Sequence, residues 1–304
     1  MKKSLKKFLI AISSIVMAVA VALLIFSAYV LVFDSHPKTV YDVSTKQDDG
    51  VVTVMNFNVR CLTPEDLGDK SWFSRADRVI KQIASVQPDI ICFQEMTPFH
   101  EDYFSYALKG YEKVVKYRQT GLINEAAPIF FNASKFDMSN VGSFWLSETP
   151  DKMSKGWGAA NYRICSSVVL TQKTTGKSFA VYNTHLDHKS ELARINGIQL
   201  VLDKITEYGS VPSMLLGDMN AYPNSETYKK ATENFADSRV VATESEENRG
   251  TWHDYGKVDY KEAIDYCFVT PNAFDVLSYH VLAEKVDGKF ASDHYALVIK
   301  LNLK

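Results

Sequence analysis

Residues Ser213–Ser225 read SMLLGDMNAYPNS, an apolar run that stops at an aspartate and continues into a polar, proline-containing segment. The apolar part has the length and composition of a buried strand. Asp218 and Asn220 follow that strand directly. A side chain at the end of a strand is held by the sheet yet reaches its rim, where binding and catalytic sites are commonly built. This stretch therefore predicts a sheet with a functional site at its edge.

Other strand-like segments stop in the same way. The polar residues are Asn58, Glu95, His185 with Asp187, Asp218 with Asn220, Asp265 inside its strand, and Asp293 with His294 before the last strand. Any one of them alone is more often a turn former or a surface residue. This interpretation is weaker for the whole set, because it must explain why acids, amides and histidines all stand at the ends of strand-like segments.

The segments around these positions alternate between strand-like and helix-like patterns. Helices are expected over Ser74–Val86 and over the run in which Leu192, Ile195, Ile198, Leu202 and Ile205 recur at helical spacing. The expected strands are Val51–Val59, Asp89–Met96, Pro128–Asn132, Gly142–Ser147, Ile164–Gln172, Ser178–Leu186, Ser213–Gly217, Ala263–Val269, Val276–Leu282 and Ala296–Leu303. Strands outnumber helices in a mixed order, which predicts an α+β layered sandwich rather than a doubly wound parallel sheet.

The short motifs at these positions carry a family resemblance. They are NFNVR around Asn58, QE at Gln94–Glu95, NTHLD at Asn183–Asp187, GDMNAYPNS at Gly217–Ser225, IDY around Asp265, and SDH at Ser292–His294. In this order the set resembles the endonuclease/exonuclease/phosphatase superfamily, and it spans nearly the whole chain after the N-terminal segment. The resemblance implies a four-layer α/β/β/α sandwich of the DNase-I-like kind. LSETPD and KGW are similar to bacterial secreted or membrane-tethered members described as metal-dependent hydrolases.

The resemblance also implies roles for the motif residues. Asn58 and Glu95 would hold Mg²⁺ or Mn²⁺, with Asp265 and Asp293 as further metal candidates, unless Asp293 instead orients the imidazole of His294. Asp218 would orient or deprotonate water, and Asn220 would hold the water or the phosphate. His185 and His294 would contact the phosphoryl oxygens. Hard cations and oxygen ligands suit each other, which agrees with this set.

Further residues are candidates for contacting the substrate. They are Arg163 before a strand, Glu125 ahead of a proline-led strand, Asp187 in NTHLD, and His253 in the TWH segment. Each has a structural alternative, as a sheet-edge, rim or loop-packing residue. Arg194 and His188 are expected to fix the local structure.

The predicted activity is metal-dependent hydrolysis of phosphoester bonds, with a phosphodiester preferred. The substrate would be nucleic acid, a nucleotide or a phospholipid headgroup. The alternatives are a dedicated extracellular nuclease and a non-catalytic surface module that keeps the fold. Nothing in the sequence indicates an obligate protein partner.

The N-terminal region indicates export. Lys2, Lys3, Lys6 and Lys7 precede Phe8–Phe33, a run without a charge or a proline, long enough to cross a bilayer. Residues 1–33 are thus expected to be a membrane anchor or a signal, 34–50 a polar tether, and 51–304 the catalytic domain. The lysines place the N-terminus in the cytoplasm and the catalytic domain outside, or secreted if the segment is cleaved.

The charge of the chain after Phe33 limits the class of binding partner, and the cysteine spacing indicates where the cysteines lie. All 36 acidic but only 30 of the 34 basic residues follow Phe33, so this part carries a formal net charge of −6. A bulk acidic domain lacks the basic signature of a protein that binds long DNA. The four cysteines, Cys61, Cys92, Cys165 and Cys267, show no metal-binding spacing and are expected to lie in the core.

Overall fold

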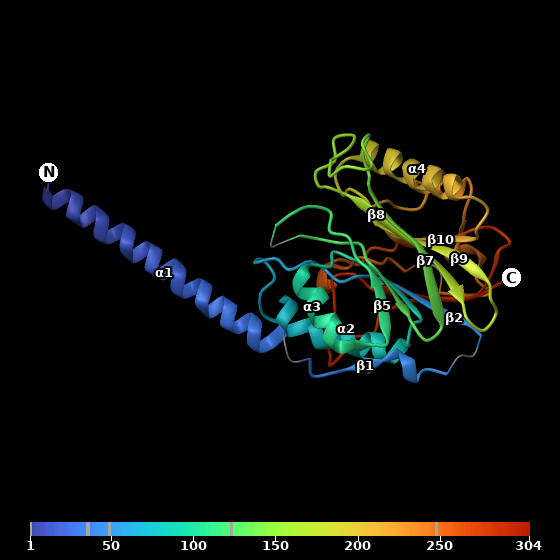
Figure 1. The fold of residues 1–304 in the computed structure, drawn as a ribbon, viewed down its shortest axis with the longest axis horizontal. Helices are drawn as coiled ribbons and strands as arrows, with labels where there is room; N and C mark the ends of the chain where they lie inside the picture. The colour runs from blue at the N-terminus through green and yellow to red at the C-terminus, as the bar shows by residue number, and fades with distance from the viewer. Residues whose placement is uncertain (1, 35–36, 48–49, 122–123, 247–248) are drawn as a thin grey trace.

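The computed structural model describes the chain except residues 1, 35–36, 48–49, 122–123 and 247–248. It shows one long N-terminal helix that leads into a layered domain (Figure 1). Helix α1 covers Lys2–Asp34, and its Leu5–Ser27 segment is long and apolar enough to cross a membrane. A helix of this kind near the N-terminus is either a membrane span or a signal sequence.

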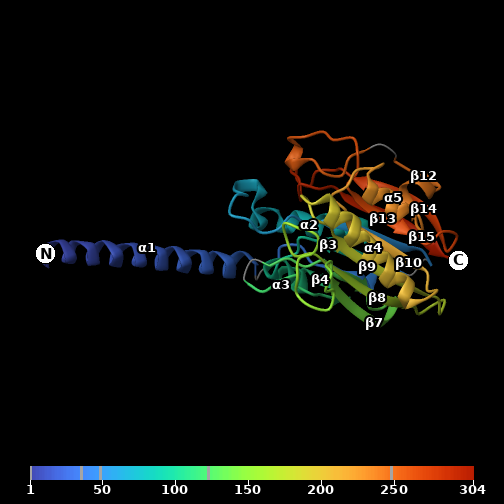
Figure 2. The same cartoon turned by 90° about the horizontal axis from the view of Figure 1, so that it is seen from above.

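Two β-sheets pack face to face in the domain (Figure 2). The seven-stranded sheet has the order β12-β14-β15-β2-β3-β6-β5, and the six-stranded sheet has the order β11-β13-β10-β9-β8-β7. The first comprises β12 (Glu244–Ser245), β14 (Phe274–Leu282), β15 (Ala296–Leu303), β2 (Val52–Asn58), β3 (Ile90–Gln94), β6 (Ile129–Asn132) and β5 (Tyr111–Val114). The second comprises β11 (Ala236–Asp237), β13 (Asp265–Val269), β10 (Ser213–Asp218), β9 (Ser178–His185), β8 (Ile164–Gln172) and β7 (Phe136–Trp145).

Helices cover the outer face of each sheet. Helices α2 (Trp72–Val86) and α3 (Pro98–Ala107) enclose one apolar cluster against the seven-stranded sheet. Helices α4 (Glu191–Tyr208) and α5 (Glu226–Thr232) enclose another against the six-stranded sheet. A third cluster, including Val54, Phe131 and Leu216, fills the space between the sheets. The predicted α/β/β/α sandwich is confirmed.

The remaining elements are short. They are β1 (Tyr41–Asp42), β4 (Leu108–Lys109), α6 (Ser238–Val241), and the 3₁₀ helices Val43–Thr45, Gly68–Lys70 and Asp254–Gly256. Strand β1 pairs in parallel with β4, and Val43 is fully buried beside it. The segment predicted to be a tether therefore packs against the domain over residues 41–45, because Tyr41 and Val43 enter the core beside α2 and α3.

Two other expectations need correction. In α4, Ile198, Leu202 and Ile205 are buried as predicted, whereas Leu192 is 60% exposed and Ile195 is partly buried, because the first turn buries Ala193 instead. Among the cysteines, Cys92, Cys165 and Cys267 are buried as expected, but Cys61 is only partly buried and lines a cleft. Helix α3 was not predicted, although Thr97 and Pro98 form a recognisable helix start.

The directions of the strands place their polar ends at the same edge of the two sheets. Strands β2 and β3 are parallel, and so are β9 and β10, so the carboxyl ends within each pair coincide. Strands β15 and β13 run antiparallel to β2 and β10, so their amino ends lie at the same edge. In the register of the six-stranded sheet, Asp218 stands between His185 and Asp265.

Gly217 is required by the close packing of β10 on β9. Its φ is +151°, and a Cβ at this position would lie 2.0 Å from the carbonyl oxygen of Thr184. We expect Gly217→Ala to lower the free energy of unfolding by about 3 kcal/mol, because the backbone of two central strands must separate. Chemical denaturation measures this loss. Gly176→Ala, in a surface turn where no atom lies within 4 Å of the added Cβ, should cost only ~1 kcal/mol from its positive φ. Equal losses in the two variants would contradict this explanation.

Candidate active site

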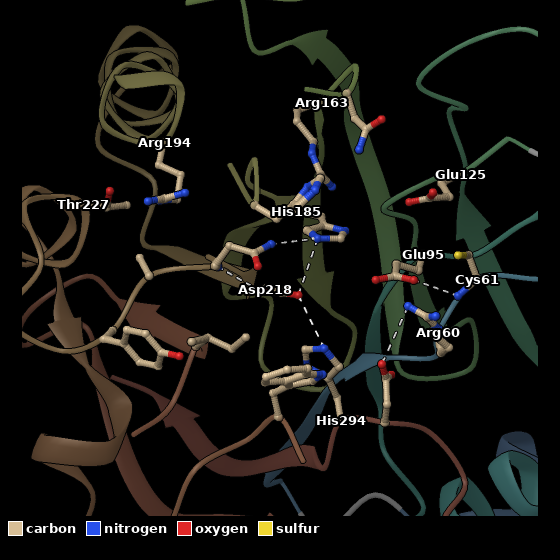
Figure 3. Close-up of a pocket in the computed structure, with 18 of the residues that line it drawn as sticks. Arg60, Cys61, Glu95, Glu125, Arg163, His185, Arg194, Asp218, Thr227 and His294 are labelled. Carbon is tan, nitrogen blue, oxygen red and sulfur yellow. Dashed lines mark hydrogen bonds and ion pairs between the residues drawn. The ribbon is translucent and has the colours of Figure 1, made fainter. Parts of the chain in front are cut away.

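A cleft of about 660 Å³ opens at the edge where the polar strand ends meet. Figure 3 shows side chains from both sheets pointing into it. Eight of the predicted site residues line it: Glu95, Glu125, Arg163, His185, Asp218, Asn220, Asp293 and His294. Asn58 and Asp265 lie directly behind them, fully or almost fully buried.

Asp218 is the centre of the polar cluster. Its Oδ2 accepts a hydrogen bond from Asn58 Nδ2 at 3.0 Å and lies 3.5 Å from His185 Nε2. Its Oδ1 accepts from the backbone N–H of Asn220 at 2.9 Å. Burial, followed by the negative charge of Asp265, raises the pKa of Asp218 to about 7. A carboxyl group with this pKa can exchange a proton near neutral pH.

His185 is held as a neutral ring. The side-chain amide of Asn220 donates to His185 Nε2 at 3.0 Å and to the carbonyl of Leu186 at 3.1 Å. Burial and the nearby charge of Arg163 lower the pKa of His185 well below its usual value. Since Nε2 accepts a hydrogen bond, the ring proton sits on Nδ1.

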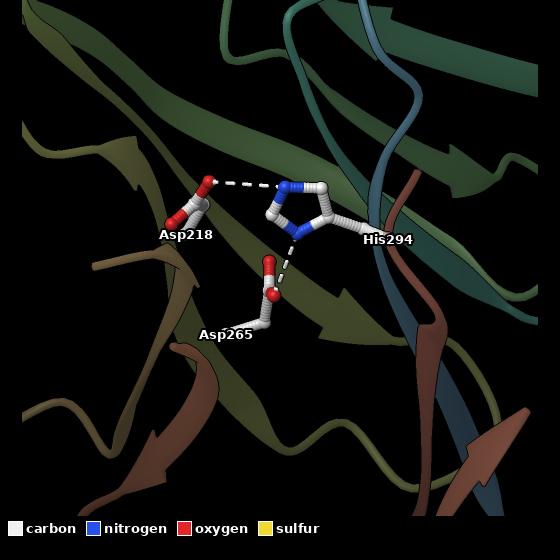
Figure 4. Close-up of side chains that lie close together, drawn as sticks. All are labelled: Asp218, Asp265 and His294. Carbon is white, nitrogen blue, oxygen red and sulfur yellow. Dashed lines mark hydrogen bonds and ion pairs between the residues drawn. The ribbon is translucent and has the colours of Figure 1, made fainter. Parts of the chain in front are cut away.

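His294 has the opposite character. Its Nδ1 donates to Asp265 Oδ2 at 2.9 Å, and its Nε2 lies 3.8 Å from Asp218 Oδ2 (Figure 4). Burial alone would lower its pKa, but the charge of Asp265 and the hydrogen bond to it outweigh burial and raise the pKa of His294 to about 10. The alternative expectation that Asp293 orients this imidazole is therefore wrong, because Asp265 does so.

A second acidic group lies across the cleft. Glu95 Oε1 accepts from Asn58 Nδ2 at 3.1 Å, and its Oε2 accepts from the N–H of Cys61 at 2.8 Å. Burial would raise the pKa of Glu95, but the Cys61 amide and positive neighbours hold it below its usual value. Asp293 is also buried, and burial followed by the charge of Glu95 raises its pKa. Arg60 Nη1 lies 3.9 Å from Asp293 Oδ2.

Two sets of residues could hold a cation. The oxygen and nitrogen atoms of Asp218, Asp265 and His294 lie within 4.8 Å of one another. We favour the Glu95 and Asp293 side instead, because His294 is protonated and already donates to Asp265. The charge of Glu95 raises the pKa of the buried Asp293, so the two neighbouring carboxyl groups lack a full counter-charge, and a hard divalent cation supplies one. These oxygen donors fit the predicted Mg²⁺ or Mn²⁺, and Asn58 stands next to them.

Arginines and an acid close one end of the cleft. Arg118 Nη2 donates to Glu125 Oε1 at 2.5 Å, and Arg163 lies beside them, 5% exposed. Within the part of the chain that is described, Arg163 Nε and Nη1 and Arg118 Nε have no hydrogen-bond partner. Buried guanidinium groups with unused donors are suited to an anion. Arg118 and Arg60 were not predicted; Arg60 stands within the NFNVR motif and was open to detection there.

Asp187 and His253 lie away from the cleft. Asp187 accepts from the N–H groups of Lys189, Ser190 and Asn161, and so fixes the start of α4. His253 stacks on Tyr295, and its Nδ1 accepts from the N–H of Gly256. Both residues therefore have local structural contacts, and neither lines this cleft, although Asp187 Oδ2 lies 3.7 Å from Nε of the lining Arg163. Arg194 donates to the carbonyl of Asp187, as expected of a local anchor, and also lines the cleft.

Comparison with known proteins agrees with this geometry. The sequence model of the Endonuclease/Exonuclease/phosphatase family matches residues 55–294. The chain belongs to this family. It is therefore a hydrolase of phosphoester bonds, like the nucleases and phosphatases among its relatives.

Solved bacterial members of the family superimpose over most of the chain. One is a Bacteroides thetaiotaomicron endonuclease/exonuclease/phosphatase family protein, 31% identical, with a TM-score of 0.78 over 84% of this chain and 98% of that one. Another is a mannosyl-6-phosphatase of the same organism, 31% identical, with a TM-score of 0.76 over 82% of this chain and 99% of that one. Rat Nocturnin is 24% identical over 262 residues, 75% of this chain. The match spans only 58% of Nocturnin.

The ionisation of His294 makes stability depend on pH. Because its pKa in the folded chain is raised to about 10, its stabilising contribution is complete below the unfolded pKa of about 6.5 and is lost as the pH rises towards 10. With chelator present, we expect the free energy of unfolding to fall by up to about 1.4 kcal/mol per pH unit in this window. Denaturant titrations at several pH values measure it.

The variant His294→Asn should remove most of this dependence, because asparagine does not titrate. His280→Asn, which replaces a partly exposed histidine on β14, serves as the matched control and should keep it. Parallel pH profiles for wild type and His294→Asn would contradict the assigned protonation of His294.

Proposed function

We propose that this protein is a Mg²⁺- or Mn²⁺-dependent phosphoester hydrolase whose catalytic domain lies on the outer side of the membrane. One arrangement carries the proposal. Asp218 stands among His185, Asn220 and His294 on one wall of the cleft, and the buried carboxylates of Glu95 and Asp293 stand on the other. A phosphate between the walls meets a proton acceptor, hydrogen-bond donors and candidate cation ligands together.

Each side chain at the site has a separate chemical role. Asp218, with a pKa of about 7, accepts a proton from the attacking water near neutral pH. The imidazolium of His294 donates a hydrogen bond to that water or to the phosphoryl oxygens, where negative charge develops. Asp265 keeps His294 oriented and protonated. Hence His294 acts as an electrostatic donor, and Asn220, whose amide N–H groups bind His185 and the Leu186 carbonyl, fixes the ring of His185 at the cleft wall.

Glu95 and Asp293, with Asn58 beside them, would hold the cation. A bound Mg²⁺ or Mn²⁺ supplies charge neutralisation on the phosphoryl oxygens. Arg163, whose Nε also lies 3.7 Å from Asp187 Oδ2, and Arg118 line the closed end of the cleft. Their guanidinium groups supply local positive charge for binding the phosphate, although the domain as a whole is acidic.

One feature supports a phosphomonoester as a second candidate beside the phosphodiester favoured by the sequence. Behind Arg118, Glu125 and Arg163 the space shrinks to about 10 Å³, enough for about one water molecule. A terminal phosphate fits against this wall, whereas a second ester chain has no room to pass through it. The similarity to a mannosyl-6-phosphatase over nearly its full length supports the same choice.

A substrate panel tests the activity. We expect the full chain to hydrolyse a small phosphomonoester or phosphodiester with Mg²⁺ or Mn²⁺, and to lose that activity in chelator. The panel contains mannose 6-phosphate, p-nitrophenyl phosphate, bis-p-nitrophenyl phosphate, nucleotides, DNA, RNA and sphingomyelin. Asp218→Asn should reduce kcat by about 10²–10⁴, since the proton acceptor is lost.

Asp137→Asn, which replaces an exposed aspartate of β7, is the matched control and should match the wild type. Turnover confined to DNA or RNA would establish the nuclease alternative. If no phosphoester is turned over, and Asp218→Asn matches the wild type in every assay, the enzymatic proposal fails and the non-catalytic alternative stands.

The membrane part of the proposal rests on α1 and the lysines before it. We expect the full chain to sediment with membranes, and protease added to intact cells to release or digest the domain, because the positive-inside rule leaves residues after Phe33 outside. Immunoblotting of shaved cells measures this, with permeabilised cells as the control. A domain that resists protease on intact cells but is digested after permeabilisation would place it in the cytoplasm.

A further inference from the structure

The membrane end of α1 contacts the start of α2. The ring of Phe26, in the second half of the uncharged Phe8–Phe33 run, lies edge-on to the ring of Phe73, with 6.4 Å between the centroids. Helix α1 also contacts α3. Only six residues separate Asp34 from the docked Tyr41, a link of at most about 25 Å. A bilayer span of about 20 residues that begins at Phe8 ends near Ser27, which places Phe73 at the bilayer surface.

The first turn of α2 lies behind the wall of the cleft. Arg75 donates to the carbonyls of Val59 and Arg60, and Arg60 lines the cleft. Trp72 packs on His100, whose Nε2 lies 3.1 Å from the carbonyl oxygen of Arg60. A single layer of side chains therefore separates the contact with α1 from the wall of the active site.

Residues 61–71, here called the cleft loop, connect these two points. Both views show this cyan segment on the side of the domain from which α1 leaves (Figures 1 and 2). At its tip, Leu67 is 77% exposed, the largest exposure among the exposed large apolar side chains described in the chain. The two aspartates of the loop are paired, Asp66 with Arg60 at 3.0 Å and Asp69 with Lys289 at 2.6 Å.

We propose that the cleft loop is a membrane-contact surface, with Leu67 in the headgroup layer of the bilayer that α1 spans. The partner is the lipid surface itself, and this inference rests on the proposed membrane anchoring by α1. An exposed apolar side chain beside a membrane span gains by leaving water, and the pairing of Asp66 and Asp69 leaves Glu65 and Lys70, of opposite sign, as the other charged side chains of the loop. The short link and the aromatic contact at Phe73 keep the loop at that surface.

The consequence concerns the substrate. The cleft opens beside the headgroup layer, so phosphoesters carried by lipids reach Asp218 and His294 without leaving the bilayer. The cleft loop begins at Cys61, itself a lining residue, so contact with the membrane is connected directly to the cleft wall.

Site-directed spin labelling tests the contact without relying on activity. The full chain, carrying Cys61→Ser to remove the partly exposed thiol, is reconstituted in phosphatidylglycerol–phosphatidylcholine vesicles with a nitroxide at Leu67→Cys. Val240→Cys, 66% exposed on α6, is the control, since α6 leads into β12 at the end of the domain away from α1 (Figure 2). Collisions of each label with oxygen, which concentrates in lipid, and with a water-soluble nickel complex are compared.

We expect the ratio of oxygen to nickel collisions at position 67 to exceed that at position 240 several-fold. Equal ratios in chains that remain in the vesicles would overturn the membrane contact and leave the proposed hydrolase and its anchor intact. Failure of the chain to incorporate into vesicles at all would overturn both the contact and the anchoring, while the phosphoester activity would still be decided by the substrate panel.

Discussion

The side-chain amide of Asn58 joins the two halves of the active site. Its Nδ2 donates to Glu95, at the end of the same sheet, and to Asp218, at the end of the opposite sheet. Asp218 is buried and Glu95 is partly buried, so the amide satisfies charges that would otherwise be costly to hold together. The separation of the two walls, and with it the width of the cleft, depends on this one group.

A second polar layer lies deeper between the sheets. Gln94 Nε2 donates to Asn56 and Asn183 at 2.8 Å each, and Asn183 donates to the carbonyls of Phe93 and Pro128. Apolar side chains alone allow two sheets to slide, because the hydrophobic effect is not directional. Hydrogen bonds between buried amides have a defined geometry and hold one sheet in register with the other. The interior is therefore polar near the site and apolar at the far end.

Much of the fold and part of the site were accessible from the sequence because they depend on local patterns. Asn58, Glu95, His185, Asp218 and His294 follow or precede apolar strands, so their position at a sheet edge follows from chain geometry alone. The pairing of His294 with Asp265 could not be predicted in this way, because it depends on the antiparallel register of β13 on β10. Arg118 was missed for a similar reason. It reaches the cleft on a loop whose position is set by pairing with residues after β3, a tertiary contact without a sequence signature. The docking of residues 41–45 likewise depends on a groove that exists only in the folded domain.

The position of β15 has a consequence for the newly made chain. This last strand lies in the interior of its sheet, between β14 and β2, and the residues just before it include Asp293 and His294. Strand β2 is the first strand that carries a site residue. It pairs with β15, which is made after every other strand of this sheet. A chain that ends before residue 293 lacks Asp293, His294 and the strand that joins β14 to β2. The site can therefore form only after this segment has been made, although Asn58 and Glu95 precede it by about 200 residues.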